Sequence, residues 1–228
     1  MDKYSELEKN TVEARKQLAE NSYIRFTNPD GKGKRVIFMG NSITLHGIKE
    51  DIGWFNEWGM AASSRENDFV HLCMKMINEK YPDAYFCVVQ AAGWEREYNE
   101  YNVREKYALA GEFNPDVIIT RLSENIQVDY LEKNPLVPAM EKFQKFLSGD
   151  SEPKLIVTSN VFNNKLKDGF LKEYAEKNGV EYVYMNDYME DKENLANEYE
   201  HEGVRIHPGD KGMKFIADRI MEKFNELM

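Results

Sequence analysis

Cysteine is scarce in this chain of 228 residues, which contains only Cys73 and Cys87. Two cysteines build no disulfide framework, and their spacing matches no metal site. Cys87 lies in an apolar run, so we expect a buried small hydrophobic residue rather than a reactive thiol. The sequence therefore predicts no metal and no disulfide scaffold.

Long apolar runs and an excess of positive charge are also missing. No stretch is apolar enough to span a bilayer, and residues 1–8 are charged and lack the hydrophobic segment of a signal peptide. Lys and Arg number 30 against 40 Asp and Glu, a net charge of -10. This acidity argues against nucleic acid or an anionic membrane as a partner. We expect a soluble cytoplasmic protein, and the sequence leaves its oligomeric state open.

Apolar segments of strand length alternate with segments of helical periodicity. We predict an α/β fold, a three-layer sandwich with a parallel sheet of about five strands, flavodoxin-like in topology. The expected strands cover 36–39, 85–89, 117–121, 154–159 and 180–185, and the expected helices cover 69–80, 137–147, 165–178 and 210–227.

The chain divides into a short extension and one domain. Residues 1–33 are interpreted as an N-terminal helical extension and linker, because 3–21 are charged and helix-prone and 28–34 contain proline and glycine. Residues 34–228 form the expected domain. Within it, 44–67 is the main irregular insertion, placed to shape a pocket.

A hydroxyl stands at the end of the first expected strand. Ser42 follows Gly40, and open α/β sheets place their chemistry at the carboxyl ends of strands. His207 stands just before the last expected helix. The pair offers a nucleophile and a general base, although a serine in this position is also a common helix N-cap.

Four blocks occur in an order that resembles the SGNH hydrolases, also called the GDSL esterase/lipase family. The blocks are Gly40-Asn-Ser-Ile-Thr44, Val88-Val-Gln-Ala-Ala-Gly-Trp94, Arg121-Leu-Ser-Glu-Asn125 and His207-Pro-Gly-Asp-Lys-Gly212. The resemblance covers the chain from about residue 35 onward. It implies an ester hydrolase without a cofactor.

The resemblance also implies a role for each matched residue. Ser42 is the nucleophile and His207 its base. The oxyanion hole is formed by the N–H of Ser42, the N–H of Gly93 (or of Ala92) and the side-chain amide of Asn125.

The blocks depart from the family pattern at four positions. Asn41 replaces an Asp, Gln90 an Asn and Ser123 a Gly. Val204 stands where the family has the Asp that orients the histidine. Either a backbone carbonyl orients His207 in a Ser-His dyad, or another acid does, with Glu202 as the nearest candidate in sequence.

We expect hydrolysis of a small acyl ester through an acyl-serine, and an O-acetylated carbohydrate is the candidate substrate. Trp54, Trp94 and His46 are the expected substrate contacts, although each Trp is equally suited to core packing. The alternative is a weak or silent homologue that binds carbohydrate or a protein partner. A nucleotide-binding module ranks last, because Gly31–Lys34 precedes the first strand, whereas a phosphate loop would follow it.

Overall fold

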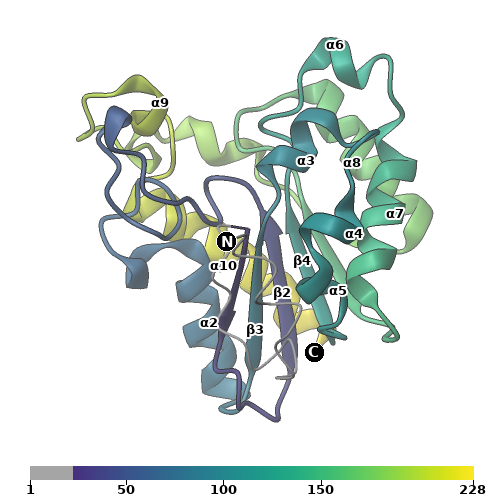
Figure 1. The fold of residues 1–228 in the computed structure, drawn as a ribbon. Helices are drawn as coiled ribbons and strands as arrows, with labels where there is room; N and C mark the ends of the chain where they lie inside the picture. Colours follow the sequence, from purple (N-terminus) through teal and green to yellow (C-terminus); the bar gives the residue numbers. More distant parts are fainter. Residues whose placement is uncertain (1–22) are drawn as a thin grey trace, which may run out of the picture.

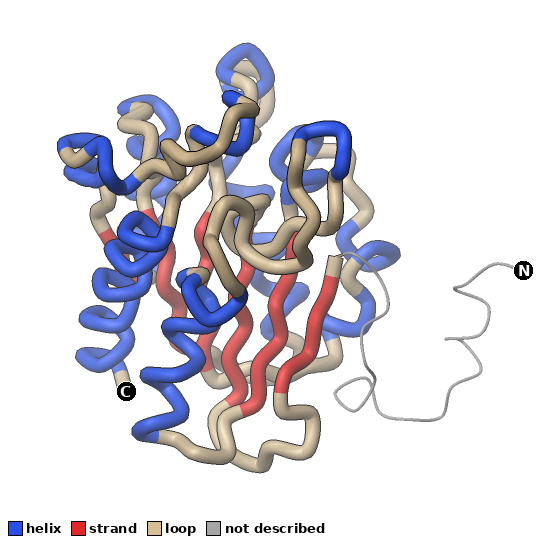
Figure 2. The backbone as a smooth tube through the Cα atoms, turned by 90° about the vertical axis from the view of Figure 1, so that its left-hand side faces the viewer, coloured by secondary structure: helices blue, strands red, loops and turns tan. Residues whose placement is uncertain are grey.

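The computed structural model describes residues 23–228, and the helix expected over 3–21 lies outside them. Its centre is a six-stranded sheet in the order β1-β3-β2-β4-β5-β6 (Figures 1 and 2). The five strands β2 to β6 are parallel to one another where they pair, which confirms the predicted α/β fold with a parallel sheet. Their bounds are β2 Arg35–Gly40, β3 Tyr85–Gln90, β4 Val117–Arg121, β5 Lys154–Thr158 and β6 Glu181–Val183.

The sixth strand lies inside the segment 1–33 that the sequence predicts to be an extension and linker. This strand, β1 (Ile24–Thr27), pairs antiparallel with β3. Ile24 and Phe26 are buried, so this short edge strand adds to the core. Four residues carry too little periodicity to predict a strand.

Helices cover both faces of the sheet. α2 (Phe69–Lys80) and α10 (Asp210–Leu227) pack on one face, against residues such as Val36 and Phe38. Side chains alternate along a strand, so Ile37 and Met39 face the other layer. That layer contains α3 Ala92–Glu97, α4 Val103–Lys106, α5 Ala108–Gly111, α7 Leu136–Ser148 and α8 Lys165–Asn178.

The remaining short elements lie among the loops at one edge of the sheet (upper edge, Figure 2). They are α6 Val128–Leu131, α9 Glu202–Arg205 and the 3-10 helices η2 Glu50–Ile52, η3 Arg65–Asn67, η4 Asn186–Glu190 and η5 Lys192–Asn194. Two of them lie within the insertion 44–67. This edge holds the loops that follow the parallel strands, where α/β proteins bind ligands.

The long helices end where the sequence predicts. The Asp68 carboxylate caps the start of α2 by accepting from the His71 N–H, and Gly179 ends α8 at φ 62. Cys87 is buried, as expected from its apolar run. Among residues 23–228, no helix is long and apolar enough to cross a membrane, and no cluster of His, Cys, Asp and Glu suits a metal ion.

Candidate active site

Strand register brings three of the four sequence blocks to the same level. Gly40 at the end of β2 pairs with Gln90 of β3 on one side and Arg121 of β4 on the other. The residues that follow each strand therefore leave the sheet together. Gly40 is required there, because a Cβ would lie 1.9 Å from Thr44 Oγ1 and 2.8 Å from the Arg121 carbonyl oxygen.

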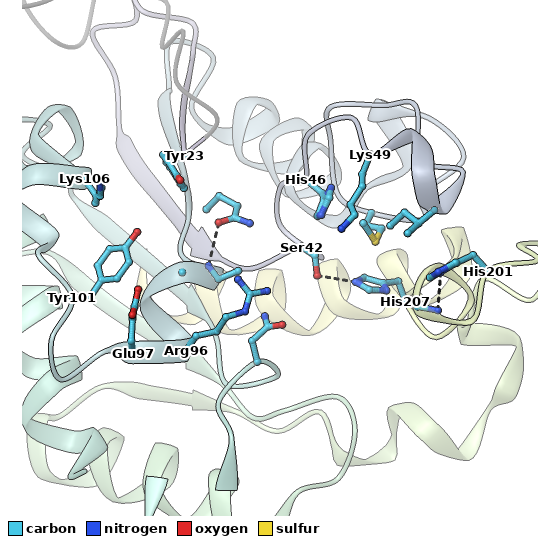
Figure 3. A pocket seen from close by; sticks show the side chains of 17 residues that line it. Tyr23, Ser42, His46, Lys49, Arg96, Glu97, Tyr101, Lys106, His201 and His207 are labelled. Carbon is cyan, nitrogen blue, oxygen red and sulfur yellow. Dashed lines mark hydrogen bonds between the residues drawn. The ribbon is translucent and has the colours of Figure 1, made fainter. Parts of the chain in front are cut away.

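Ser42 and His207 meet across 165 positions of sequence. The Ser42 Oγ lies 2.7 Å from the His207 Nε2, the hydrogen-bond geometry that a serine nucleophile and its base would need (Figure 3). Both side chains line an open pocket of about 580 Å³ at the carboxyl edge of the sheet. The expected pair is thus brought together in a cavity large enough for a sugar ester.

The imidazole of His207 is neutral at ordinary pH. Burial lowers the pKa of His207 to about 4, and the nearby charges of His46 and Arg121 act in the same direction. The nearby Gly203 carbonyl acts in the opposite direction and raises this pKa in part. The Nδ1 nevertheless makes no well-formed hydrogen bond to any residue in the described range.

Among residues 23–228, no acidic side chain forms a hydrogen bond with the other side of this ring. Glu202, the expected candidate, is exposed in the first turn of α9, and no described hydrogen bond joins it to His207. Val204 is fully buried and packs with Trp54, Met60 and other apolar residues under the insertion. Val204, which stands where the family has its acid, is thus part of a small apolar core. The Gly203 carbonyl is the backbone acceptor near the His207 ring.

The expected oxyanion donors lie around the same pocket. Asn125 and Gly93 both line it with Ser42. The Ala92 N–H already donates to the Gln90 side-chain oxygen at 3.1 Å, which favours Gly93 over Ala92 as donor. Within residues 23–228, we find no hydrogen-bond acceptor for the N–H groups of Ser42 and Gly93.

A buried carboxylate, Glu95, holds this group of residues in place. One oxygen accepts from the Ser123 N–H at 2.5 Å and from Asn41 Nδ2 at 3.1 Å, and the other accepts from Asn125 Nδ2 at 2.5 Å. An amide nitrogen carries two hydrogens, so Asn125 keeps one for the pocket. Burial and the Glu124 carboxylate raise the pKa of Glu95, and its three donors act in the opposite direction.

Asn41 and Arg121 join Glu95 to the second carboxylate, Glu124. The Asn41 Nδ2 donates to Glu124 at 2.6 Å, and its oxygen accepts from Arg121 at 3.3 Å. Arg121 also pairs with Glu124 at 2.5 Å. Sequence reasoning missed Glu95, Glu124 and Arg121, although all three lie within or beside the quoted blocks.

Ser123 adopts a backbone conformation typical of glycine. Its φ is 116°, in the region that side chains with a Cβ rarely enter, and the family pattern has Gly at this position. The Ser123 Oγ accepts from the Asn160 side chain at 3.0 Å, and its N–H binds Glu95. These contacts hold a strained residue two positions before Asn125.

The buried carboxylates explain why position 41 carries an amide. We expect Asn41→Asp to lower the free energy of unfolding by about 3 kcal/mol at pH 8, because a third carboxylate would face Glu95 and Glu124 with one Arg121 between them. Such repulsion raises carboxyl pKa values, so the loss shrinks as pH falls and a proton is taken up.

Urea unfolding at pH 8 and pH 5 checks this expectation. Asn99→Asp is the matched control, because Asn99 is exposed and should change stability by less than about 0.5 kcal/mol. An Asn41→Asp protein as stable as its parent at pH 8 would contradict the proposed repulsion.

The two tryptophans expected to contact substrate do not line the pocket. Trp54 is fully buried with Trp58, at a ring distance of 6.0 Å, in the apolar core beneath the insertion. Trp94 is fully buried against Phe143 at 5.2 Å. Both indoles pack in the core and stabilise the segments that carry them. The prediction of ligand contact was wrong for both.

Other side chains take the place of the tryptophans. His46 lines the pocket as expected, and burial lowers its pKa. Tyr23 and Tyr101 supply the aromatic surface, on the side away from His207 (Figure 3). An isolated tyrosine in sequence carries no signal for this role.

The fold is similar to that of known esterases. A variant of an acetyl xylan esterase from Geobacillus stearothermophilus matches with a TM-score of 0.53 and 15% identity, over 84% of this chain and 94% of that chain. A two-domain esterase active on acetylated mannans matches with a TM-score of 0.55 and 17% identity, over 85% of this chain and 48% of that chain. A member of the lipolytic protein G-D-S-L family from Veillonella parvula matches with a TM-score of 0.50 and 14% identity, over 84% of this chain and 98% of that chain.

Two further matches are versions of the Geobacillus stearothermophilus enzyme that are described as catalytic mutants, one with a serine and one with a histidine replaced by alanine. No protein-family model and no curated protein sequence matches the chain. At these identities the comparisons establish an SGNH/GDSL-like fold.

Proposed function

We propose that this protein is a serine esterase that hydrolyses a small acyl ester, with an O-acetylated carbohydrate as substrate. The observation that carries the proposal is the hydrogen bond of 2.7 Å between Ser42 and His207 at the edge of the sheet. The fold neighbours that act on acetylated xylan and mannan support the choice of substrate.

Each residue of the site has a step in this mechanism. Ser42 Oγ attacks the ester carbonyl carbon while His207 Nε2 takes its proton. The negative charge on the carbonyl oxygen is stabilised by the N–H groups of Ser42 and Gly93 and by the Asn125 amide. His207 then gives the proton to the leaving alcohol. The same histidine activates a water molecule that releases the acid from Ser42.

His207 acts in this mechanism without an orienting carboxylate. When Nε2 accepts from Ser42, the proton of the neutral ring is on Nδ1, and the Gly203 carbonyl is the backbone acceptor near the ring. The lack of an acid partner among residues 23–228 also supports the rival hypothesis, a weak or silent homologue that binds its ligand without turnover. Labelling distinguishes the two.

The test is reaction with a fluorophosphonate probe. We expect the folded protein to be modified at Ser42 alone, at a rate that falls strongly in His207→Ala. Peptide mapping identifies the labelled serine, and circular dichroism confirms that the variant is folded. A folded wild-type protein that stays unlabelled from pH 6 to pH 9 would reject the esterase and leave the binding protein.

The low pKa of His207 predicts an unusual pH profile. The base works when neutral, and a folded-state pKa of about 4 keeps it neutral far below the usual 6.5. We therefore expect the part of the kcat/KM profile that reports His207 to have its midpoint near pH 4. Burial raises the pKa of Glu95, so protonation of Glu95 adds a separate fall at higher pH.

Glu95→Gln serves as a control for the pH profile, because it removes the titration of Glu95, a buried carboxyl group beside the site. A midpoint that stays in place in this variant assigns the acid limb to His207. A midpoint at 6.5 in Glu95→Gln would show that the imidazole is not desolvated in solution.

A further inference from the structure

The pocket is basic although the protein is acidic. Among the described residues, its lining includes three cations, Lys49, Arg96 and Lys106, and a single carboxylate, Glu97. Over the whole chain, acidic residues outnumber basic ones by 40 to 30. A concave surface whose charge is opposite to that of the molecule concentrates ligands of the other sign.

Arg96 is the lining cation that is available to a ligand. Lys106 pairs with Glu105 at 3.3 Å, and Lys49 lies 3.9 Å from Asp51. Arg96 makes no hydrogen bond or ion pair to any residue in the described part of the chain, and its side chain is exposed. It follows the oxyanion residue Gly93 by three positions on α3.

Arg96 also faces the reacting groups. In Figure 3 its side chain extends toward Ser42, whereas Glu97, Tyr101 and Lys106 lie on the side away from His207. The charges of Lys49 and Arg96 both act on His46, after burial, to lower its pKa. The two cations therefore face the same part of the pocket from the insertion and from α3.

We propose that the site takes acyl esters of anionic sugars and that Arg96 binds the carboxylate or sulfate of the sugar. A guanidinium donates two parallel hydrogen bonds to either group, and Tyr23 and Tyr101 offer aromatic faces for the sugar ring. This inference rests on the proposed esterase function and specifies its substrate.

The test compares three acetyl esters that differ in charge: mono-O-acetylated methyl glucuronoside, the matching glucoside 6-sulfate and the matching neutral glucoside. We expect kcat/KM for one of the anionic esters to exceed that for the neutral ester by about 10-fold or more. The excess should fall as sodium chloride is raised, because salt screens exposed charges.

Arg96→Gln should reduce this preference by at least about 5-fold. Arg104→Gln is the matched control, since Arg104 is exposed on α4, lies over the Phe146 ring and does not line the pocket. The ratio between charged and neutral esters is the readout, so a general loss of activity does not imitate the effect.

Hydrolysis and binding measurements together show whether the anion-site inference fails or the proposed esterase function fails. Equal hydrolysis of all three esters would overturn the inference and leave the esterase standing. If no ester is hydrolysed, calorimetry of Ser42→Ala with methyl glucuronoside, the glucoside 6-sulfate and methyl glucoside decides. Preferred binding of an anionic sugar would keep the anion site and reject the esterase, and equal or absent binding would reject both.

Discussion

Ser42→Ala is expected to reduce kcat/KM for an acetyl ester by about 10⁴- to 10⁶-fold. The change removes the attacking oxygen and one hydrogen bond, to His207. His207→Ala should have an effect of similar size, because the hydroxyl is a poor nucleophile without its base. The double variant should lose little more, since the two residues act as one unit.

Acetate release measured on the purified variants checks this result. Ser148→Ala is the matched control, because Ser148 lies at the end of α7 and its hydroxyl binds the Gln144 carbonyl, away from the pocket. Its activity should equal that of the parent. If Ser42→Ala keeps more than a tenth of the activity, acyl transfer to Ser42 is not the mechanism.

Asn125→Ala is expected to lower kcat by about 100- to 1,000-fold, the usual effect of removing one oxyanion donor. The free energy of unfolding should fall as well, by about 1–3 kcal/mol, because the buried Glu95 carboxylate would lose one of its hydrogen-bond donors. The sequence alone predicts a rate effect for this residue. The structure adds the stability effect, because the amide also binds a buried carboxylate.

Glu95→Gln tests whether the buried carboxylate that binds Asn125 also supports catalysis. An amide at position 95 keeps only one accepting oxygen, so its NH2 group would face either the Asn125 donor or the donors of Asn41 and Ser123. We therefore expect kcat to fall by about 10- to 100-fold with little change in KM. Glu100→Gln, an exposed change in the same segment, should have no effect. An equal rise in KM would instead place Glu95 in substrate binding.

The larger elements were predictable because their signals are local. The helices over 69–80, 165–178 and 210–227 begin and end where periodicity and capping residues place them. The strand β1 was missed because it is short and depends on pairing with β3. Pairing between distant segments is not encoded in the pattern of either one.

The tryptophans show why residue type and loop position are weak guides to a pocket. Trp54 lies in the insertion and Trp94 in α3, the segments expected to flank the nucleophile, yet both side chains are buried in the core. A large apolar ring gains more by burial than by exposure at a rim. Only packing decides which side of a loop faces the ligand.

The sequence by itself determined the α/β class, the order of the elements, and the serine and histidine at their ends, because these features follow from periodicity and short blocks. Tertiary structure alone decided what surrounds them. Glu95 and Glu124 meet Asn41 from 54 and 83 positions away, and Arg96 enters a pocket built from the insertion, α3 and α9. The charge of a site is the sum over residues that only folding makes neighbours.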